Sequence, residues 1–354
     1  MPMEPGFSLR ALTAEDGALI SALSDQSSDS GAVGFHSLYH YDAYATLMAL
    51  HENACGVIAE AGEQPGIVGM GMMSLGTCQY EGSLRPFAYL FSLSVHPQYR
   101  RRGIASQLAA WRIRQARERI GAEGVVYAGI QGGNTASLRT AARWSSQLVS
   151  SSARVAIVKM RSAPWKSGVD WQEVRPAAEG DWEAAAHHQN AFYAEHNLYP
   201  PRTAEETAAW HNLAPFGERI REYYLLRDRR GNLLAGCSVT EEGRLVTIEI
   251  TRMSGPFRAA NALVKIFPAG GRVRRLHVKD LWYAPGREDA ALHLWETLRW
   301  QLRERGNLMM FFFDSHTPLA QVIRTPWYMP RAGGSLALSA PQPMSDHRPV
   351  YFIV

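Results

Sequence analysis

The chain has 354 residues, a net charge of +4 and 46% hydrophobic residues, which describe a globular protein of about two domains and exclude a disordered or fibrous one. No apolar run approaches the ~20 residues that span a bilayer, and the N-terminal segment lacks the layout of a signal peptide, so we expect a cytoplasmic protein without a membrane anchor. The arginines are spread along the chain, which argues against a nucleic-acid partner.

Cysteines and histidines give no sign of a disulfide framework or a metal site. Cys55, Cys78 and Cys237 share no metal-ligand spacing, and an odd number of cysteines cannot all pair. We therefore expect reduced cysteines in a protein core. Histidines gather only within residues 187–196, where no H-E-x-x-H pattern occurs, so no metal is predicted.

The first predicted elements are a strand, a turn and a helix over residues 7–23. Thr13 is a plausible N-cap there, and Asp16 completes a capping box three residues later. A hairpin is indicated next, with Pro65 and Gly66 in its turn. Hydrophobic periodicity then predicts a strand over 88–95, a long amphipathic helix over 104–121 and a strand over 124–130.

The second half of the chain repeats this order. Residues 173–186 again predict a strand, a turn and a helix, and Arg175 precedes Asp181 by the same six residues that separate Arg10 from Asp16. A second hairpin, with its turn at 230–232, precedes a predicted strand over 274–283, a helix over 290–306 and a strand over 307–313.

Strands that alternate with helices predict the α/β class, with each sheet covered by helices. Because the two halves share one order of elements, we expect two tandem domains of the same fold. The predicted boundaries are 1–162 for the first domain, 163–170 for a linker and 171–354 for the second domain.

Residues 90–111 carry the most informative pattern. An apolar strand ends at Val95, Pro97 removes a backbone donor, and three arginines lead into Gly103 at the start of a helix. A helix start offers unsatisfied N–H groups and a positive dipole end, and a small residue there allows a diphosphate to come close. A solvated basic turn would explain an isolated R-x-x-G-x-A motif, but the strand before it and the long helix after it favour an anion site.

This segment resembles the pyrophosphate loop of the GNAT superfamily of N-acetyltransferases, an Arg/Gln-x-x-Gly-x-Gly/Ala motif after the fourth strand. Arg100, Gly103 and Ala105 fill those places, and the resemblance covers roughly residues 7–160. The full-length layout is similar to hookless-type plant acetyltransferases and related bacterial tandem GNAT proteins. The resemblance implies two tandem acyl-CoA N-acyltransferase-like domains (an α+β GNAT-like fold), each a mixed, mainly antiparallel sheet flanked by helices.

The same resemblance implies acetyl-CoA as the co-substrate, held along the open edge of the strand that ends at Val95. Asn134 matches the asparagine that contacts CoA at the start of the following helix, and it is also a good N-cap. The residues expected to bind the cofactor are Leu93, Ser94, Val95, Arg100, Arg101, Arg102, Gly103, Ile104, Ala105, Ser106 and Asn134.

The chemistry expected is direct attack of an amine on the thioester carbonyl, helped by a general base and a general acid. Many GNAT enzymes carry a glutamate on the fourth strand, and this strand has none. His96, Ser94 and Tyr89 are the candidate catalytic residues, with Glu81 in the preceding loop as a remote alternative. Ala141 stands where the family often has an acid tyrosine.

The second half departs from the motif, because Arg287 is followed by Glu288 and Asp289, which would repel a diphosphate. We expect this degenerate GNAT-like domain to have lost CoA binding and to be structural or acceptor-binding. The aromatic residues that could line an acceptor cleft, or serve only as packing, are Phe192, Tyr193, Tyr199, Trp327 and Tyr328.

The sequence therefore predicts an acetyl-CoA-dependent N-acetyltransferase that acts on a small-molecule or peptide amine, with no nucleic-acid or membrane partner. The alternative is a CoA-binding or regulatory module without turnover, and transfer of a longer acyl group also fits the scaffold. The acceptor stays open because a fold does not fix a substrate, and a homodimer is compatible with the resemblance.

Overall fold

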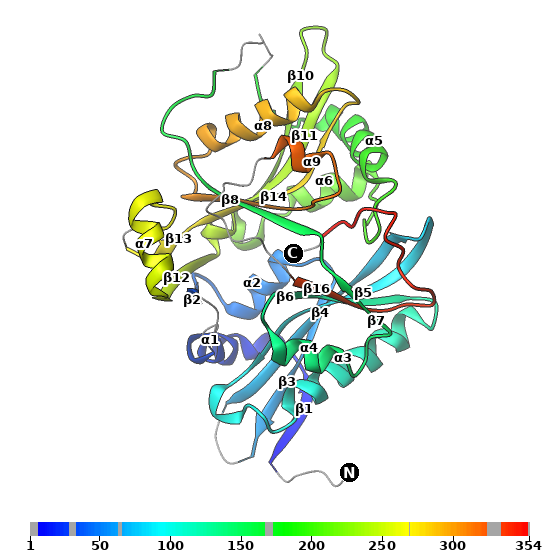
Figure 1. The fold of residues 1–354 in the computed structure, drawn as a ribbon, viewed down its shortest axis with the longest axis vertical. Helices are drawn as coiled ribbons and strands as arrows, with labels where there is room; N and C mark the ends of the chain where they lie inside the picture. The colour runs from blue at the N-terminus through cyan, green and yellow to red at the C-terminus, as the bar shows by residue number, and fades with distance from the viewer. Residues whose placement is uncertain are drawn as a thin grey trace.

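The computed structural model describes residues 6–27, 33–62, 66–166, 173–268, 270–323 and 334–352, and Figure 1 shows them in two lobes, one above the other. Four parts of the predictions lie outside the described residues: Pro65 of the first hairpin turn, residues 167–170 of the predicted linker, Trp327 and Tyr328. Within the described residues, no helix has the length and apolar character needed to cross a membrane.

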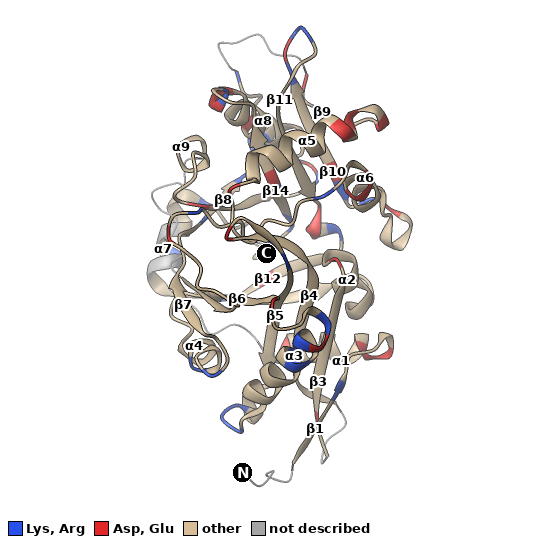
Figure 2. Cartoon of the chain, turned by 90° about the vertical axis from the view of Figure 1, so that its right-hand side faces the viewer, with Lys and Arg blue, Asp and Glu red and all other residues tan. Residues whose placement is uncertain are grey.

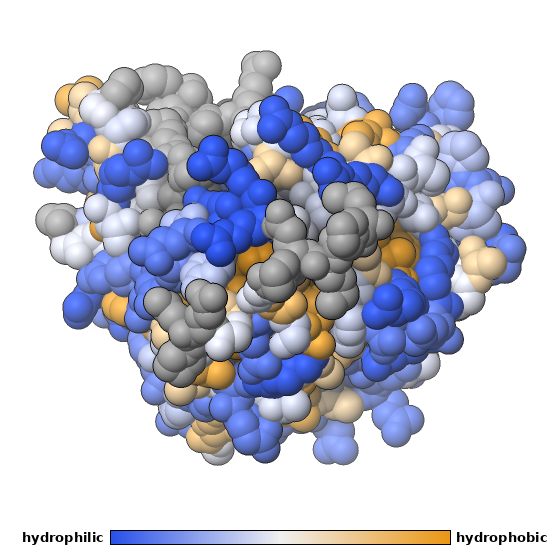
Figure 3. Space-filling view, turned by 90° about the horizontal axis from the view of Figure 1, so that it is seen from below, coloured by the Kyte–Doolittle hydropathy of each residue, from blue (hydrophilic) through white to orange (hydrophobic). Residues whose placement is uncertain are grey.

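The first lobe is built on a seven-stranded sheet with the order β1-β3-β4-β5-β6-β16-β7. Its elements are β1 (Phe7–Ala11), η1 (Ala14–Asp16), α1 (Gly17–Gln26), α2 (Ala43–Leu50), β3 (Ala54–Ala61), β4 (Ile67–Tyr80), β5 (Ser83–Val95), η2 (Pro97–Tyr99), α3 (Ile104–Ile120), β6 (Val125–Gln131), α4 (Thr135–Ala141), β7 (Gln147–Ser150) and β16 (Gly334–Ser339). Seen from below, this lobe is mostly hydrophilic, with apolar residues nearer the centre of the face (Figure 3).

Side-chain alternation along β3 buries both faces of this sheet. Val57 and Ala59 pack with residues of α3, whereas Ile58 packs with residues of α1 and α2. Successive residues of a strand point to opposite faces, so an uninterrupted apolar run is what a sheet covered on both sides requires. The helices thus cover opposite faces, as the α/β prediction expected.

The second lobe is built on a six-stranded sheet with the order β8-β15-β14-β11-β10-β9. Its elements are β8 (Ala153–Lys159), β9 (Arg175–Pro176), η3 (Glu179–Asp181), α5 (Trp182–Tyr193), α6 (Ala204–Asn212), η4 (Pro215–Gly217), β10 (Arg221–Arg227), β11 (Leu233–Thr240), η5 (Glu242–Arg244), β14 (Arg275–Tyr283), α8 (Glu288–Gln301), β15 (Leu308–Asp314) and α9 (Leu319–Val322). Residues of α8 pack in the core on one face, and residues of α5 pack in a separate cluster with Tyr223 and Trp282.

The two lobes repeat one plan, as the sequence predicted. The Arg10 guanidinium donates to Asp16 at 2.8 and 2.7 Å, and the Arg175 guanidinium donates to Asp181 at 2.8 and 3.3 Å. Each carboxylate also accepts a 2.8 Å backbone hydrogen bond three residues upstream, from Thr13 in the first lobe and from Ala178 in the second. In both lobes a strand runs through a long helix into a parallel neighbour, from β5 to β6 and from β14 to β15.

The strand pairing crosses the predicted domain boundary in both directions. β8 precedes residue 162 but pairs along its length with β15 of the second lobe. β16 lies far beyond the predicted linker, yet it pairs with β6 on one side and β7 on the other, within the first lobe. Each lobe therefore contains one strand from the other half of the sequence, a feature that the order of elements alone did not predict.

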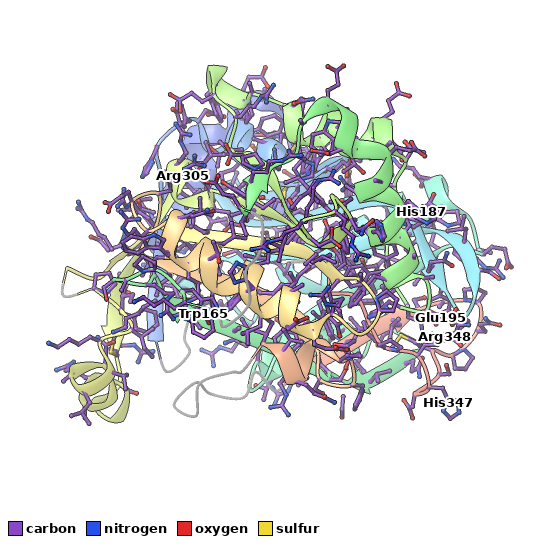
Figure 4. All side chains as sticks on the ribbon, turned by 90° about the horizontal axis from the view of Figure 1, so that it is seen from above. Trp165, His187, Glu195, Arg305, His347 and Arg348 are labelled. Atoms are coloured by element: carbon purple, nitrogen blue, oxygen red, sulfur yellow. The ribbon has the colours of Figure 1, made fainter. Side chains whose placement is uncertain are left out.

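A third sheet joins the lobes, with the order β13-β12-β2, and α7 (Gly255–Val264) follows its central strand. β2 (Val33–Tyr39) comes from the first half, and β12 (Val246–Met253) and β13 (Arg272–Val273) come from the second. Side-chain contacts add to this connection: Arg348 and Glu195 point toward each other in Figure 4, with Nη1 and Oε2 at 3.0 Å.

Candidate functional site

The loop between β5 and α3 has the geometry of an anion site. Gly103, the N-cap of α3, has a φ of +81°, and a Cβ built on it would meet no atom within 4 Å. The first backbone hydrogen bond of the helix runs from Gln107 N to the Gly103 carbonyl at 3.1 Å, so the amides at the start of α3 are not used within the helix. The open space at Gly103 lets a ligand approach this positive helix end.

The arginines of the loop lie around this helix start. Arg100 donates from Nε to the Val95 carbonyl at 3.2 Å, and the Arg102 guanidinium lies 4.9 Å from the centre of the Tyr99 ring. Ser106 accepts a 3.0 Å hydrogen bond from Arg143, which follows α4. Further basic residues follow along α3 (Figure 2). The segment therefore combines free helix-end amides with positive charge.

β5 and β6 separate after a short parallel ladder. They pair only from Phe87 to Tyr89 on β5, opposite Val125 to Tyr127 on β6, although β5 continues to Val95. The edge of β5 that includes Leu93, Ser94 and Val95 therefore has no pairing with β6. An unpaired strand edge offers backbone donors and acceptors to an extended ligand, which is the property the resemblance requires of this segment.

A bulge in the β4–β5 ladder is held by a buried arginine. The register shifts between Met70 and Met72, and Ser92 has a φ of +48°. The side chain of Arg112 in α3 lies next to Gly71 at this shift, and Arg112 is 2% exposed. Its guanidinium donates to the carbonyls of Met72 at 2.9 Å and Phe91 at 3.2 Å. Arg112 thereby fixes the backbone next to the open edge of β5 and satisfies carbonyls that the bulge releases.

Asn134 caps the next helix, as expected. Its side-chain oxygen accepts a 3.0 Å hydrogen bond from Ser137 N, and it begins α4 directly after β6. Ala141, in the place of the family's tyrosine, is buried with Ile130 and Ala337. The Tyr127 ring packs against Tyr89 with ring centres 5.1 Å apart, and desolvation by burial raises the pKa of its phenol well above the usual value.

The corresponding helix start in the second lobe is occupied by the chain's own charges. Asp289 accepts a 2.9 Å hydrogen bond from Ala290 N and forms an ion pair with Arg287, whose Nε lies 3.1 Å from its carboxylate. Glu288 adds a second carboxylate to the first turn of α8. Carboxylates at this helix start would repel a diphosphate, and the loss of CoA binding by the second lobe stays a prediction.

The three candidate catalytic residues, two in β5 and one just after it, lie apart. His96 caps η2, its Nδ1 accepting from Gln98 N at 3.3 Å, and Ser94 lies two residues before it near the end of the strand. Tyr89 lies toward the middle of the strand, where desolvation by burial raises its pKa to about 12, so its phenol stays protonated at neutral pH. Glu81 is bound to Ser345 and Asn197 instead, and although burial raises its pKa, these hydrogen bonds hold it below the usual value.

A cavity of about 320 Å³ lies between the two lobes. The first lobe contributes residues 50–53, 74–77, Phe87 and Tyr89, and the second contributes residues 200–202, parts of α6, β10, β11 and β14, and Tyr351. Tyr89 is therefore the only one of the three candidate catalytic residues among the described residues that line it. The cavity joins the strand that leads to the phosphate loop with side chains of the second lobe.

Of the aromatic residues that could line an acceptor cleft or serve only as packing, those that are described serve as packing. Tyr193 and Tyr199 are 3% and 1% exposed with ring centres 5.0 Å apart, and Phe192 packs against the core of the second lobe. The residues that follow Tyr199 line the cavity instead, ending at Arg202. An apolar aromatic run in sequence does not distinguish a packed helix from a pocket wall.

Two neutral histidines reach the cavity, and sequence reasoning missed both. His51 lines it directly and packs on Phe91 of β5 with ring centres 4.2 Å apart; burial, and then the charge of Lys279, lower its pKa to about 3. His211 reaches it through Ser238, whose Oγ lies 2.8 Å from Nε2, while Nδ1 lies 2.7 Å from the Thr207 carbonyl. No motif marks either residue, because lobe packing brings them there from distant segments.

Residues 20–144 match the model of the acetyltransferase (GNAT) family. The whole chain is similar in fold to N-myristoyltransferase of Saccharomyces cerevisiae with bound myristoyl-CoA, at a TM-score of 0.64 and 10% identity, covering 100% of this chain and 86% of that one. It is also similar to a GCN5-related N-acetyltransferase of Sphaerobacter thermophilus, at a TM-score of 0.59 and 16% identity over 96% of this chain and 97% of that one. A third similar structure, from Anabaena variabilis, has a TM-score of 0.52 and 11% identity, with coverages of 93% and 72%. No curated protein matches the chain in sequence.

The structural similarities at these identities concern the fold, and the two-lobed arrangement is what they share with this chain. The family match concerns the first lobe, where the phosphate loop and the open edge of β5 lie. Residues 20–144 therefore match the acetyltransferase (GNAT) family model, and the chain has the two-lobed fold seen in these N-acyltransferase structures.

Proposed function

We propose that the chain transfers an acetyl group from acetyl-CoA to an amine that binds in the cavity between the lobes. The observation that carries this proposal is that β5 connects the expected donor site with the cavity. Its open edge leads to the helix start at Gly103, and its Phe87 and Tyr89 line the cavity. A thioester lying along that edge would present its carbonyl to the cavity, where the acceptor would attack it.

The residues proposed to hold the donor are those of the open strand edge and the loop. Backbone groups of Leu93, Ser94 and Val95 would bind the pantetheine arm, and the amides from Gly103 to Ser106 would bind the diphosphate. Arg100, Arg101 and Arg102 add charge, and Asn134 lies at the neighbouring helix start. The second lobe would then form one wall of the acceptor site and bind no CoA of its own.

In the reaction, the amine nitrogen forms a bond to the thioester carbon and the carbon–sulfur bond breaks. An ammonium gives up two protons in forming the amide, of which one protonates the leaving thiolate and the other is released to solvent. The amine must lose a proton before or during attack. We assign the acceptance of that proton to His51, because its ring lines the cavity and contacts Phe91 on the strand proposed to hold the thioester. With a pKa of about 3, the ring would pass the proton on to solvent and not retain it. Tyr89 also lines the cavity, but a phenol with a pKa of about 12 is a poor proton donor to a thiolate.

The proposed function is tested by following free thiol release from acetyl-CoA with a panel of amines. We expect acceptor-dependent release, with the acylated amine found in equal amount by mass spectrometry. Donors with longer acyl chains test the acyl specificity, and we expect them to react more slowly. Tight binding of CoA with no release across the panel would instead identify a binding module without turnover.

Replacing His51 with glutamine is expected to lower kcat about 100-fold, which is the lower range for loss of a general base. Because the pKa of His51 is about 3, its ring is already neutral above about pH 4, so the variant should lower the plateau of the pH–rate profile without moving its rising limb. Ser238→Ala is the matched control, because it removes the hydrogen bond that connects His211 to the cavity. A large loss with Ser238→Ala and none with His51→Gln would transfer the role to Ser238 and His211.

The chain is further proposed to work in the cytoplasm, and a homodimer is compatible with the fold. Among the described residues, no group of three or more His, Cys, Asp or Glu side chains is arranged to hold a metal ion. Cys78 and Cys237 are buried and Cys55 is partly buried, all as free thiols.

A further inference from the structure

The cavity between the lobes contains a buried guanidinium that forms no ion pair among the described residues. Arg221, the first residue of β10, lines the cavity and is 2% exposed. Its Nη2 donates to the Ala49 carbonyl, whereas its Nη1 is buried without a hydrogen-bond partner among the described residues. A buried charge with an unsatisfied donor is costly, so such a group is retained where a ligand completes its contacts.

The carboxylates around this cavity are already held by other groups. Glu52 pairs with Arg202 at 2.5 Å, and Asp280 accepts a 2.5 Å hydrogen bond from the Tyr351 hydroxyl. Glu242 lies against Arg275 and His277, with its carboxylate 2.9 Å from His277 Nδ1. Arg221 feels the charges of Glu52 and Glu242 but forms a direct ion pair with neither.

The surroundings of Arg221 fix its guanidinium in one orientation. The group stacks on the Trp210 ring of α6, with its central carbon 3.7 Å from the ring centre, and Arg202 lies over the same ring at 5.5 Å. Stacking on an aromatic face leaves the edge of a guanidinium, where its N–H groups point, for a planar anion. Lys279 lines the same cavity, and its ammonium group and the Arg221 guanidinium act on each other electrostatically.

From this arrangement we propose that the acceptor is an amine that also carries an anionic group, a carboxylate or a phosphate, and that Arg221 binds that group. This inference rests on the proposed function, because it assigns the cavity to the acceptor. Arg221 retains its charge at neutral pH, since burial lowers its pKa only to about 10. The anion would supply the partner that Nη1 lacks, while the amine would reach toward His51 and the open edge of β5.

The kinetic test compares acceptors that differ only in the anion. Each of a set of α-amino acids is paired with its carboxamide, and phosphoethanolamine is paired with ethanolamine. We expect the anionic member of at least one pair to have a kcat/KM about 10- to 100-fold higher, the range for a hydrogen bond to a charged group. In Arg221→Gln this ratio should fall to about one, through a higher KM for the anionic acceptors, whereas Arg221→Lys should keep part of it.

The matched control is the double substitution Glu52→Gln and Arg202→Gln, which removes an ion pair from the same cavity without changing its net charge. This variant should keep the preference for anionic acceptors. The proposal is overturned if Arg221→Gln keeps the preference. It is also overturned if the unmodified chain has the same kcat/KM for the neutral and the anionic member of every pair.

A binding measurement separates this proposal from the proposed function. N-acetylated amino acids and O-phosphorylated N-acetylethanolamine carry the anion without a reactive amine, so their binding needs no turnover. Calorimetry should show at least one of them binding more tightly than its neutral analogue, with the difference lost in Arg221→Gln. Such binding without any thiol release would contradict the proposed transferase activity but not the anion site. Equal binding of anionic and neutral analogues would contradict the anion site, whether or not the chain releases thiol.

Discussion

Replacing Gly103 with glutamate is expected to weaken acyl-CoA binding more than 100-fold, because the change places a carboxylate at the helix start where the diphosphate is proposed to bind. The carboxylate would occupy the open space at Gly103 and compete for the amides of the first turn of α3. A loss of about 3 kcal/mol corresponds to this factor and is reasonable for replacing attraction by repulsion at short range. Calorimetric titration with CoA measures the effect directly.

The control for Gly103→Glu is the same substitution at Gly286, which lies just before α8 in the second lobe. Both glycines have a positive φ, +81° and +71°, and a Cβ on either meets no atom within 4 Å, so the backbone strain introduced is similar. Gly286→Glu should bind CoA like the unmodified chain, because Asp289 already occupies that helix start. Equal binding by the Gly103 variant would remove the pyrophosphate assignment.

The second large effect concerns the exchanged strands: a fragment of residues 1–162 is expected not to fold on its own. It lacks β16, so β6 and β7 lose the strand that lies between them, and its own β8 loses its partner β15. Leu336, Ala337 and Leu338 of β16 are 4%, 0% and 0% exposed, and the space they fill would open to water. Circular dichroism should show no cooperative thermal transition for this fragment.

A point substitution tests the same contact in the full chain. Ala337→Asp puts a charge among Ile130 and Ala141 and should destabilise the protein by several kcal/mol, enough to unfold the first lobe. Leu148→Asp is the control, because Leu148 pairs with Ala337 across the ladder but is 47% exposed. A stable, cooperatively folding fragment 1–162 would show that the first domain is complete at the predicted boundary.

The fold was predictable wherever residues close together in the sequence determine an element. The strand, turn and helix at the start of each half follow from caps and periodicity, and the repeated spacing of Arg10 and Asp16 corresponds to matching ion pairs in both lobes. The loop at Gly103 was predictable for the same reason, since a strand end, a glycine with positive φ and a helix start are encoded within a few residues. The role of the neighbouring candidate His96 stays a prediction, and in the structure its Nδ1 accepts a hydrogen bond that caps η2.

By itself, the sequence determined two repeated α/β halves, and it predicted a phosphate loop in the first and the loss of that loop in the second. Only the tertiary structure decided which strand completes which sheet, because an apolar strand such as β16 pairs equally well with any open edge of suitable register. The cavity follows the same rule: His51, Arg221 and Ser238 are each unremarkable in their own segments. They line one cavity because the two lobes meet there, and contacts between residues far apart in sequence leave no local pattern.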